Sequence, residues 1–213
     1  MSTKTGLIAA ACAAGLFVAG RAQAQVPSDS PTSFGYAKLG YGGVFGDRAY
    51  GGPSLGFGYR AEVDTWGFDV SFLNFQVPSS TNDSSARGSS GSLLKLQGLH
   101  YVDSDADASL YFGGGFSYGF ADFGGGSSGP GFYDSSWHGS GLQAELTIGY
   151  ELPRRSPLRM FVEANATLPF YNVAFERTTY ARALSSTSVV SHRYAPAVAV
   201  SVGLGWDRRW RVP

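Results

Sequence analysis

The 213-residue sequence has few of the residues that build reactive or covalently stapled sites. It holds one cysteine, two methionines and three histidines. Cys12 lies in an apolar N-terminal segment, so removal of that segment would leave a chain with neither disulfides nor thiolate chemistry. The histidines, His100, His138 and His192, lie far apart and the carboxylates are dispersed, so we expect no metal site and no cofactor.

The chain also lacks an excess of charge and a long apolar run in its body. Its formal net charge is zero and it contains no basic block, which disfavours nucleic acid as a partner. No stretch of about 18 apolar residues follows the N-terminal segment, so no membrane-spanning helix is expected.

The N-terminus has the three parts of an export signal. Lys4 supplies a positive start, residues 7–20 form an Ala-rich apolar core, and Ala22-Gln23-Ala24 is a small-x-small cleavage site. We therefore predict a signal peptide over 1–24 and a flexible lead over 25–33. A lipoprotein signal ending at Cys12 is an alternative, but cleavage there would leave a very short hydrophobic stretch.

Glycine and aromatic residues are abundant. The sequence has 30 Gly, 15 Phe, 12 Tyr and 4 Trp, and the glycines follow no triplet period, which excludes collagen. Their spread through strand-like segments indicates curved strands and close backbone approach.

The segment 141–169 shows the dominant pattern. Two runs alternate apolar and polar residues with period two, on either side of the short polar turn 153–157. Such alternation indicates β-strands with two unlike faces, and each run has the roughly 9–11 residues that a tilted strand needs to cross a bilayer.

The same alternation predicts eight strands, at 34–44, 53–62, 66–77, 92–102, 108–120, 142–152, 158–168 and 192–206. The phase changes in the third strand, so we expect a bulge near Leu73. The connections 63–65, 103–107 and 153–157 are short, whereas 45–52, 78–91, 121–139 and 170–191 are long and rich in Gly, Ser, Asn and Thr. Short turns at one end and long loops at the other are typical of outer-membrane barrels.

These features resemble the small eight-stranded outer-membrane β-barrels of the OmpA/OmpX type, over residues 34–206 and including the strand LYFGGGFSY at 110–118. The resemblance implies an all-β, antiparallel, up-and-down transmembrane barrel with short periplasmic turns and long extracellular loops. It also implies a location in the outer membrane of a Gram-negative cell. Barrels of this family usually end on an aromatic residue. Here a tail over 207–213 follows Trp206, so Trp210 is the alternative terminal aromatic.

The polar face of the predicted strands carries nine charged residues, which we expect to form an ion network in the lumen: Lys38, Arg60, Glu62, Asp69, Lys95, Glu145, Glu151, Arg159 and Glu163. Parity across the turns places Glu151 opposite Arg159, and Arg60 beside or diagonal to Asp69. Lys95, Glu145 and Glu163 lie further from the short turns and are expected to form a second layer. Buried charges must be paired, and the resemblance implies that such a network plugs the lumen. A gate or a proton path is the alternative use of these charges.

The apolar face predicts a lipid-facing belt of Leu55, Phe57, Tyr59, Trp66, Phe68, Leu110, Phe112, Leu142, Leu146, Ile148, Tyr150, Met160, Val162, Val200, Leu204 and Trp206. A soluble lipocalin-like barrel would turn this face inward. Nine charges interspersed with glycines on the other face favour the membrane barrel.

A catalytic site is the less favoured hypothesis. His138-Gly139-Ser140 has the His-x-Ser spacing of lipid A deacylases of this barrel class, but the nearby Glu145 and Glu151 face inward, so no outward carboxylate is expected to orient the imidazole. The acidic run 103–107 resembles the start of a calcium loop but lacks the glycine and the distal glutamate. We therefore predict no catalytic residues.

The sequence therefore predicts a non-enzymatic barrel with a structural or surface role through its long loops. The expected partners are outer-membrane lipids and lipopolysaccharide, the barrel-insertion machinery and a surface ligand. A lipid A-modifying enzyme and a small-solute conduit remain as alternatives.

Overall fold

The fold is described from a computed structural model of the chain, for residues 32–46, 49–77, 87–126, 133–181 and 184–207. The predicted signal peptide, most of the lead and the tail beyond Asp207 lie outside these residues. The described residues form the strands β1 (Thr32–Phe45), β2 (Ala49–Val63), β3 (Trp66–Val77), β4 (Arg87–Tyr101), β5 (Ser109–Gly126), β6 (Tyr133–Leu152), β7 (Leu158–Pro169), β8 (Val173–Ala181), β9 (Leu184–Arg193) and β10 (Ala197–Asp207).

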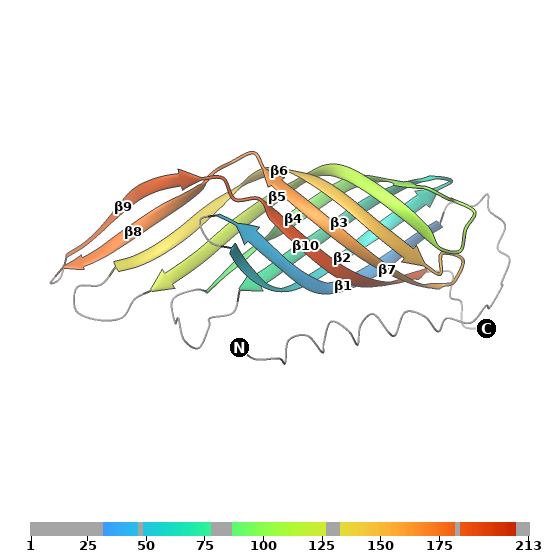
Figure 1. Cartoon of the computed structure of the whole chain (residues 1–213), viewed down its shortest axis with the longest axis horizontal. Helices are drawn as coiled ribbons and strands as arrows, with labels where there is room; N and C mark the ends of the chain where they lie inside the picture. The colour runs from blue at the N-terminus through green and yellow to red at the C-terminus, as the bar shows by residue number, and fades with distance from the viewer. Residues whose placement is uncertain (1–31, 47–48, 78–86, 127–132, 182–183, 208–213) are drawn as a thin grey trace.

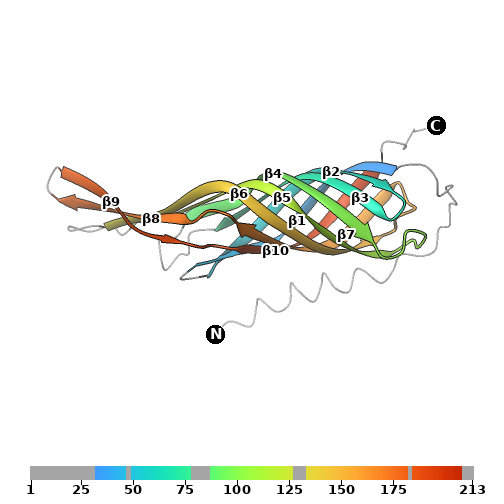
Figure 2. The ribbon, with the colours of Figure 1, turned by 90° about the horizontal axis from the view of Figure 1, so that it is seen from above.

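Eight of these strands close into an antiparallel barrel, as the sequence predicts. The neighbours run β5-β4-β3-β2-β1-β10-β7-β6, and the pairing of β5 with β6 closes the circle. The first and last strands, β1 and β10, lie side by side with Phe34 opposite Asp207. Figures 1 and 2 show the resulting tube of tilted strands. No helix in the described part of the chain is long and apolar enough to cross a membrane.

The turns between β2 and β3, β4 and β5, and β6 and β7 are short and lie at one end of the barrel. The tightest joins β2 to β3 through Asp64 and Thr65. Asp64 has a φ of 53°, in the left-handed region that aspartate tolerates better than branched residues do.

The predicted loop over 170–191 is wrong, because most of it forms the hairpin β8–β9. β8 pairs with the first part of β6, from Tyr133 opposite Thr179 to His138 opposite Ala174, and β9 pairs with β8. β6 has 20 residues and β7 has 12, so β6 has a free edge beyond the end of β7 to which β8 adds. Figures 1 and 2 show this sheet projecting beyond the barrel, at the end opposite the short turns.

The predicted eighth strand, over 192–206, is also wrong in its first part. β9 ends at Arg193, residues 194–196 are irregular, and β10 starts at Ala197. Pro196 cannot donate to a strand ladder, and its carbonyl accepts a hydrogen bond from the Phe45 amide at 2.8 Å. The chain therefore crosses from the projecting sheet back to the barrel at this point.

The expected bulge near Leu73 lies on the neighbouring strand. The pairing of β3 with β4 shifts between Ser71 and Leu73, and the pairing of β4 with β5 shifts between Ser92 and Leu94. The extra residue is Leu93 on β4, which is exposed like Leu94. β3 keeps its alternation, so Leu73 and Phe75 are buried on the inner face and the phase change predicted for β3 is wrong.

Candidate functional site

The inner face of the barrel gathers the charged residues. All nine charges predicted for the lumen lie on this face, and each is at most 4% exposed. The thirteen most exposed of the sixteen predicted belt residues lie on the outer face at 46% exposure or more, while Leu110, Met160 and Val162 are partly exposed. The two sets separate because alternate side chains of a strand point to opposite faces.

Arg60, on β2, is the largest fully buried side chain and the centre of the ion network. Its Nε donates to Asp69 Oδ2 at 3.1 Å, Nη1 to Glu151 Oε2 at 3.2 Å, and Nη2 to Glu163 Oε2 at 3.4 Å. Asp69 lies directly opposite Arg60 on β3. The guanidinium also lies 4.8 to 5.8 Å from the ring centroids of Phe34, Tyr36, Tyr111 and Phe161. Rings and carboxylates therefore replace the water that Arg60 loses on burial.

A second cluster lies nearer the short turns. Arg159 Nη1 donates to Glu62 Oε2 at 2.8 Å and to Glu151 Oε1 at 3.0 Å. The predicted register is wrong by two residues, because Phe161 is the residue directly opposite Glu151. The ion pair still forms because the long side chain of Arg159 reaches Glu151, its diagonal neighbour on the adjacent strand.

Arg154 completes this cluster, although no pattern in the sequence indicated its burial. It lies in the short polar turn between β6 and β7, yet it is 8% exposed. Its guanidinium lies 3.9 Å from the centroid of the Tyr101 ring, donates to the carbonyls of Asp103 and Ser104 at 3.0 Å, and pairs with Glu62 at 3.4 Å. The turn therefore folds back to cover this end of the lumen.

Two lysines, Lys38 and Lys95, extend the ion network away from the short turns. Lys38 Nζ donates to Glu163, and Lys95 Nζ donates to Asn165 and lies 3.5 Å from Glu145 Oε2. Asn165 Nδ2 donates to Glu163 Oε1 at 3.0 Å, so one amide links the two lysine pairs. With Arg154 included, five cations and five carboxylates interlock along the lumen.

Inward glycines provide space for inward rings. Phe161 lies opposite Gly203, and Tyr111 lies opposite Gly149. A methyl group at Gly203 would come within 2.1 Å of the Phe161 ring, and one at Gly149 within 2.3 Å of the Tyr111 ring. Each ring therefore packs against the backbone of a glycine, where no side chain takes up space. This lets the narrow lumen of an eight-stranded barrel hold both aromatic rings and ion pairs.

Several polar partners of this network were not predicted from the sequence. The Tyr36 hydroxyl donates to Asp69 at 2.9 Å, that of Tyr101 to Glu62 at 2.6 Å, and that of Tyr111 to Glu163 at 3.0 Å. All three tyrosines share the parity of the charged face, which is the signal that places them inside.

His138 has a carboxylate partner on the outer face, so the prediction that none lies there is wrong. His138 Nε2 lies 3.3 Å from Glu176 Oε1, and both side chains are partly exposed. Glu176 belongs to β8, which had been predicted as loop. Among the described residues, no hydrogen bond joins Ser140 to His138.

The described part of the chain contains no group of three metal-binding side chains. In the acidic turn, Asp103 Oδ1 accepts hydrogen bonds from the amides of Asp105 and Ala106.

Above the ion network, toward the projecting sheet, the inner face becomes apolar. A cluster of Val44, Phe75, Ala121, Phe123, Val173, Ala195 and Ala197 fills this end, with Tyr50, Val77, Trp137 and Tyr171 packed against it. Gln143 Nε2 donates to the Tyr171 hydroxyl at 2.8 Å and links the apolar cluster to the polar lumen. Burial raises the pKa of the Tyr171 hydroxyl above its ordinary value.

No family model and no curated protein matches the sequence. Among solved structures, the chain is similar to Neisserial surface protein A (NspA), with a TM-score of 0.59 and 10% identity over 83% of this chain and 98% of that one. It is also similar to a major outer membrane protein from Thermus thermophilus, with a TM-score of 0.53 and 13% identity over 81% and 99% of the two chains. At these identities the likeness shows the fold alone, and the predicted fold, an eight-stranded antiparallel up-and-down β-barrel like those of these outer-membrane proteins, is confirmed.

Proposed function

We propose that this protein is a non-enzymatic outer-membrane β-barrel with a closed polar lumen, which acts at the cell surface through its projecting sheet and loops. The observation that carries the proposal is the segregation of its two faces. Nine charges that the sequence places on one face are almost completely buried, while large apolar side chains cover the outside. A soluble barrel reverses this arrangement.

The outer face favours lipid as its surroundings. Leu39, Phe57, Phe116 and Leu142 are each about 60% exposed or more in the isolated chain, on four different strands. Soluble monomers rarely expose a contiguous apolar patch larger than a few hundred Å². Outer-membrane lipids and lipopolysaccharide cover this apolar belt, which runs round the barrel. The chain reaches the membrane after export directed by the cleaved segment 1–24 and delivery by the barrel-insertion machinery.

The lumen favours a plug over a conduit. Arg60 alone bridges carboxylates from three other strands, β3, β6 and β7, so the network crosses the full width of the barrel. Water and solutes would have to break several buried ion pairs to pass, and separating one buried pair costs several kcal/mol. The proposed surface role therefore belongs to the end of the barrel that carries β8 and β9.

The location is tested by fractionation. We expect the barrel in the detergent-soluble outer-membrane fraction, with a different mobility in unboiled and boiled gels because its closed hydrogen-bonded wall resists detergent. In planar bilayers the purified protein should give no stable conductance steps. Recovery as a soluble periplasmic protein would rule out the membrane proposal, and regular conductance steps would rule out the plug.

One substitution tests the outer face directly. Met160 lies on the outer face of β7, opposite Leu204 of β10. Met160→Arg should lower the free energy of unfolding by about 2–4 kcal/mol if it lies at the bilayer midplane, and by less near an interface. Chemical unfolding from lipid vesicles measures the difference, and an unchanged value would argue against lipid at this position.

A hydrolase of the lipid A deacylase type is the second candidate, favoured by the contact between His138 and Glu176. A carboxylate that orients an imidazole beside a serine is the arrangement of nucleophilic hydrolases. Lipid A incubated with the purified barrel should lose no acyl chain under the main proposal. Acyl release that disappears in Ser140→Ala would instead assign the hydrolase.

A further inference from the structure

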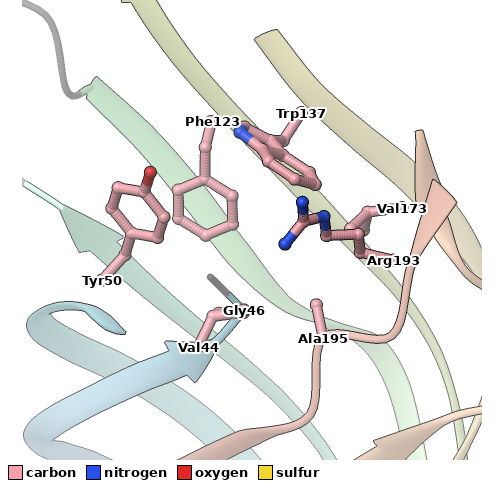
Figure 3. A pocket seen from close by; sticks show the side chains of 8 residues that line it. All are labelled: Val44, Gly46, Tyr50, Phe123, Trp137, Val173, Arg193 and Ala195. Atoms are coloured by element: carbon pink, nitrogen blue, oxygen red, sulfur yellow. The ribbon is translucent and has the colours of Figure 1, made fainter. Parts of the chain in front are cut away.

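A pocket opens at the apolar end of the inner face, above the ion network. Its lining residues are Val44, Gly46, Tyr50, Phe123, Trp137, Val173, Arg193 and Ala195. They come from β1, β2, β5, β6, β8, β9 and the segments that follow β1 and β9, so most of the barrel mouth and the projecting sheet contribute (Figure 3). The pocket is an open hollow, and the empty space of about 360 Å³ against these residues includes open solvent.

Three aromatic rings, those of Tyr50, Phe123 and Trp137, line the pocket and are held in place by their neighbours. The rings of Tyr50 and Phe123 are stacked, with centroids 5.4 Å apart and 22° between their planes. The Trp137 ring packs on Phe175, with centroids 4.6 Å apart. Val44, Phe123 and Val173 are buried. Apolar and aromatic walls with a few polar groups are typical of sites for small molecules.

One cation lies in this apolar wall. The guanidinium of Arg193 lies 5.6 Å from the centroid of the Trp137 ring, and Figure 3 shows it directed into the space between Phe123, Trp137 and Ala195. Arg193 is placed there because it lies opposite Val173 in the pairing of β8 with β9. Arg193 has other interactions within the protein, and a planar guanidinium offers several donors, so it can serve more than one acceptor.

We propose that this pocket binds a small amphipathic anion, an aromatic or short aliphatic carboxylate whose apolar body stacks on Trp137 and Phe123 and whose charged end meets Arg193. The lining side chains belong to the inner face, so the ligand comes from the aqueous side of the mouth and not from the bilayer. The ion network closes the lumen beneath the pocket, so the ligand is held and does not pass through. That this mouth faces the outside of the cell rests on the proposed function.

Equilibrium dialysis of two matched probes against the barrel in lipid nanodiscs tests the pocket, with empty nanodiscs as the baseline. Naphthalene-2-carboxylate carries the anionic end, and naphthalene-2-carboxamide has the same rings without the charge. We expect saturable binding of the carboxylate at one site, about fivefold or more tighter than the carboxamide, because hydrogen bonds to charged groups are roughly twice as strong as neutral ones. Equal affinity for the two probes would overturn the role of Arg193.

Substitutions localise the binding. Arg193→Gln should remove the preference for the carboxylate and leave the carboxamide unaffected, while Trp137→Leu should weaken both probes by about tenfold through the loss of ring contact. Gly46 is an exposed lining residue, so Gly46→Leu should block the pocket without disturbing the strands. The control is Trp66→Leu, which removes an exposed outer tryptophan near the short turns.

Gel mobility without boiling shows that each variant is folded. Binding that survives both Trp137→Leu and Gly46→Leu, or that does not saturate, would overturn the pocket. Loss of binding in Trp66→Leu would place the site on the outer face instead. These measurements use the purified barrel, so they do not depend on its location in the cell. If neither probe binds, the fractionation result still holds. If the barrel is inserted the other way round, the binding result still holds.

Discussion

At the scale of single residues, the interior combines two kinds of fit, charge against charge and ring against glycine. Arg60 and Arg159 each bond to more than one carboxylate, and Asp69 has Arg60 as its cation. Rings such as Phe161 occupy the space that a glycine on the next strand leaves open. Loss of an arginine therefore leaves buried carboxylates with too little compensating charge, and a larger residue at such a glycine overfills the lumen.

Arg159→Met tests the first kind of fit. It removes a partner from both Glu62 and Glu151, so we expect a loss of about 3–5 kcal/mol in the free energy of unfolding, measured in urea from lipid vesicles. Adding Glu151→Gln should restore only part of the loss, because Glu62 then keeps Arg154 as its one cation. If neither the single nor the double variant changes the unfolding curve, the ion pairs are not buried in the membrane-inserted protein. Arg155→Met, in the exposed part of the same turn, is the control and should change stability by less than about 1 kcal/mol.

Gly203→Ala tests the second kind of fit. The added methyl would lie 2.1 Å from the Phe161 ring, so we expect a loss of about 1–3 kcal/mol through overpacking. Gly98→Ala is the matched control, since nothing lies within 4 Å of a methyl group there. Unfolding in urea should separate the two variants clearly. Equal stability of the two would mean that the Phe161 ring moves aside without cost.

At the scale of elements, the hairpin β8–β9 departs most from the simple barrel. Its strand pairing to the barrel is made with β6 alone, while Val173 also packs in the apolar cluster, and its far end pairs only with itself and with the first residues of β6. Edge strands of this kind usually carry features that prevent them from pairing with other chains. The hairpin also supplies Val173 and Arg193 to the pocket, so the part nearest the barrel has a role that its tip does not share.

Shortening the hairpin should leave the barrel intact. Replacement of residues 177–189 by Asn-Gly, which favours a tight hairpin turn, joins Glu176 to Val190 and so keeps Phe175 opposite Ser191. We expect the change in mobility on boiling to persist and the free energy of unfolding to stay within about 1 kcal/mol of the parent protein. Replacement of 154–157 by the same dipeptide is the contrasting variant and should destabilise the barrel, because it removes the buried Arg154. A shortened hairpin that no longer folds would show that the projecting sheet is part of the barrel's core.

At the scale of the whole molecule, the two ends of the barrel differ. Arg154 and the ion network lie toward the short-turn end, whereas the other end bears the projecting sheet and the pocket. This polarity has a function only if the two ends face different compartments, so the orientation in the membrane is the measurement that matters most at this scale.

Single cysteines report that orientation, because the only native cysteine lies in the segment expected to be removed. Asn172 lies between β7 and β8 and Asp105 lies in the turn between β4 and β5, and both are exposed. On intact cells a membrane-impermeant maleimide should label Asn172→Cys, and should label Asp105→Cys only after lysis. The reverse pattern would show that the barrel is inserted the other way round.

The sequence by itself determined which way most side chains of the strands face. Lys38, Arg60 and Glu163 could be assigned to the interior from parity alone, because alternation between faces is a property of the local backbone of a strand. The same local rule predicted the number of barrel strands and the short turns, since each depends on residues that are neighbours in the chain.

Only the tertiary structure decided which residues meet. Glu163 pairs with Lys38, 125 positions away, and Glu151 lies opposite Phe161 where a turn centred on Arg155 would have placed Arg159. The hairpin β8–β9, the contact of Glu176 with His138 and the pocket above the lumen depend likewise on pairings across distant strands. Register and closure of a barrel are set by the stagger of all its strands together, which no single segment of the sequence encodes.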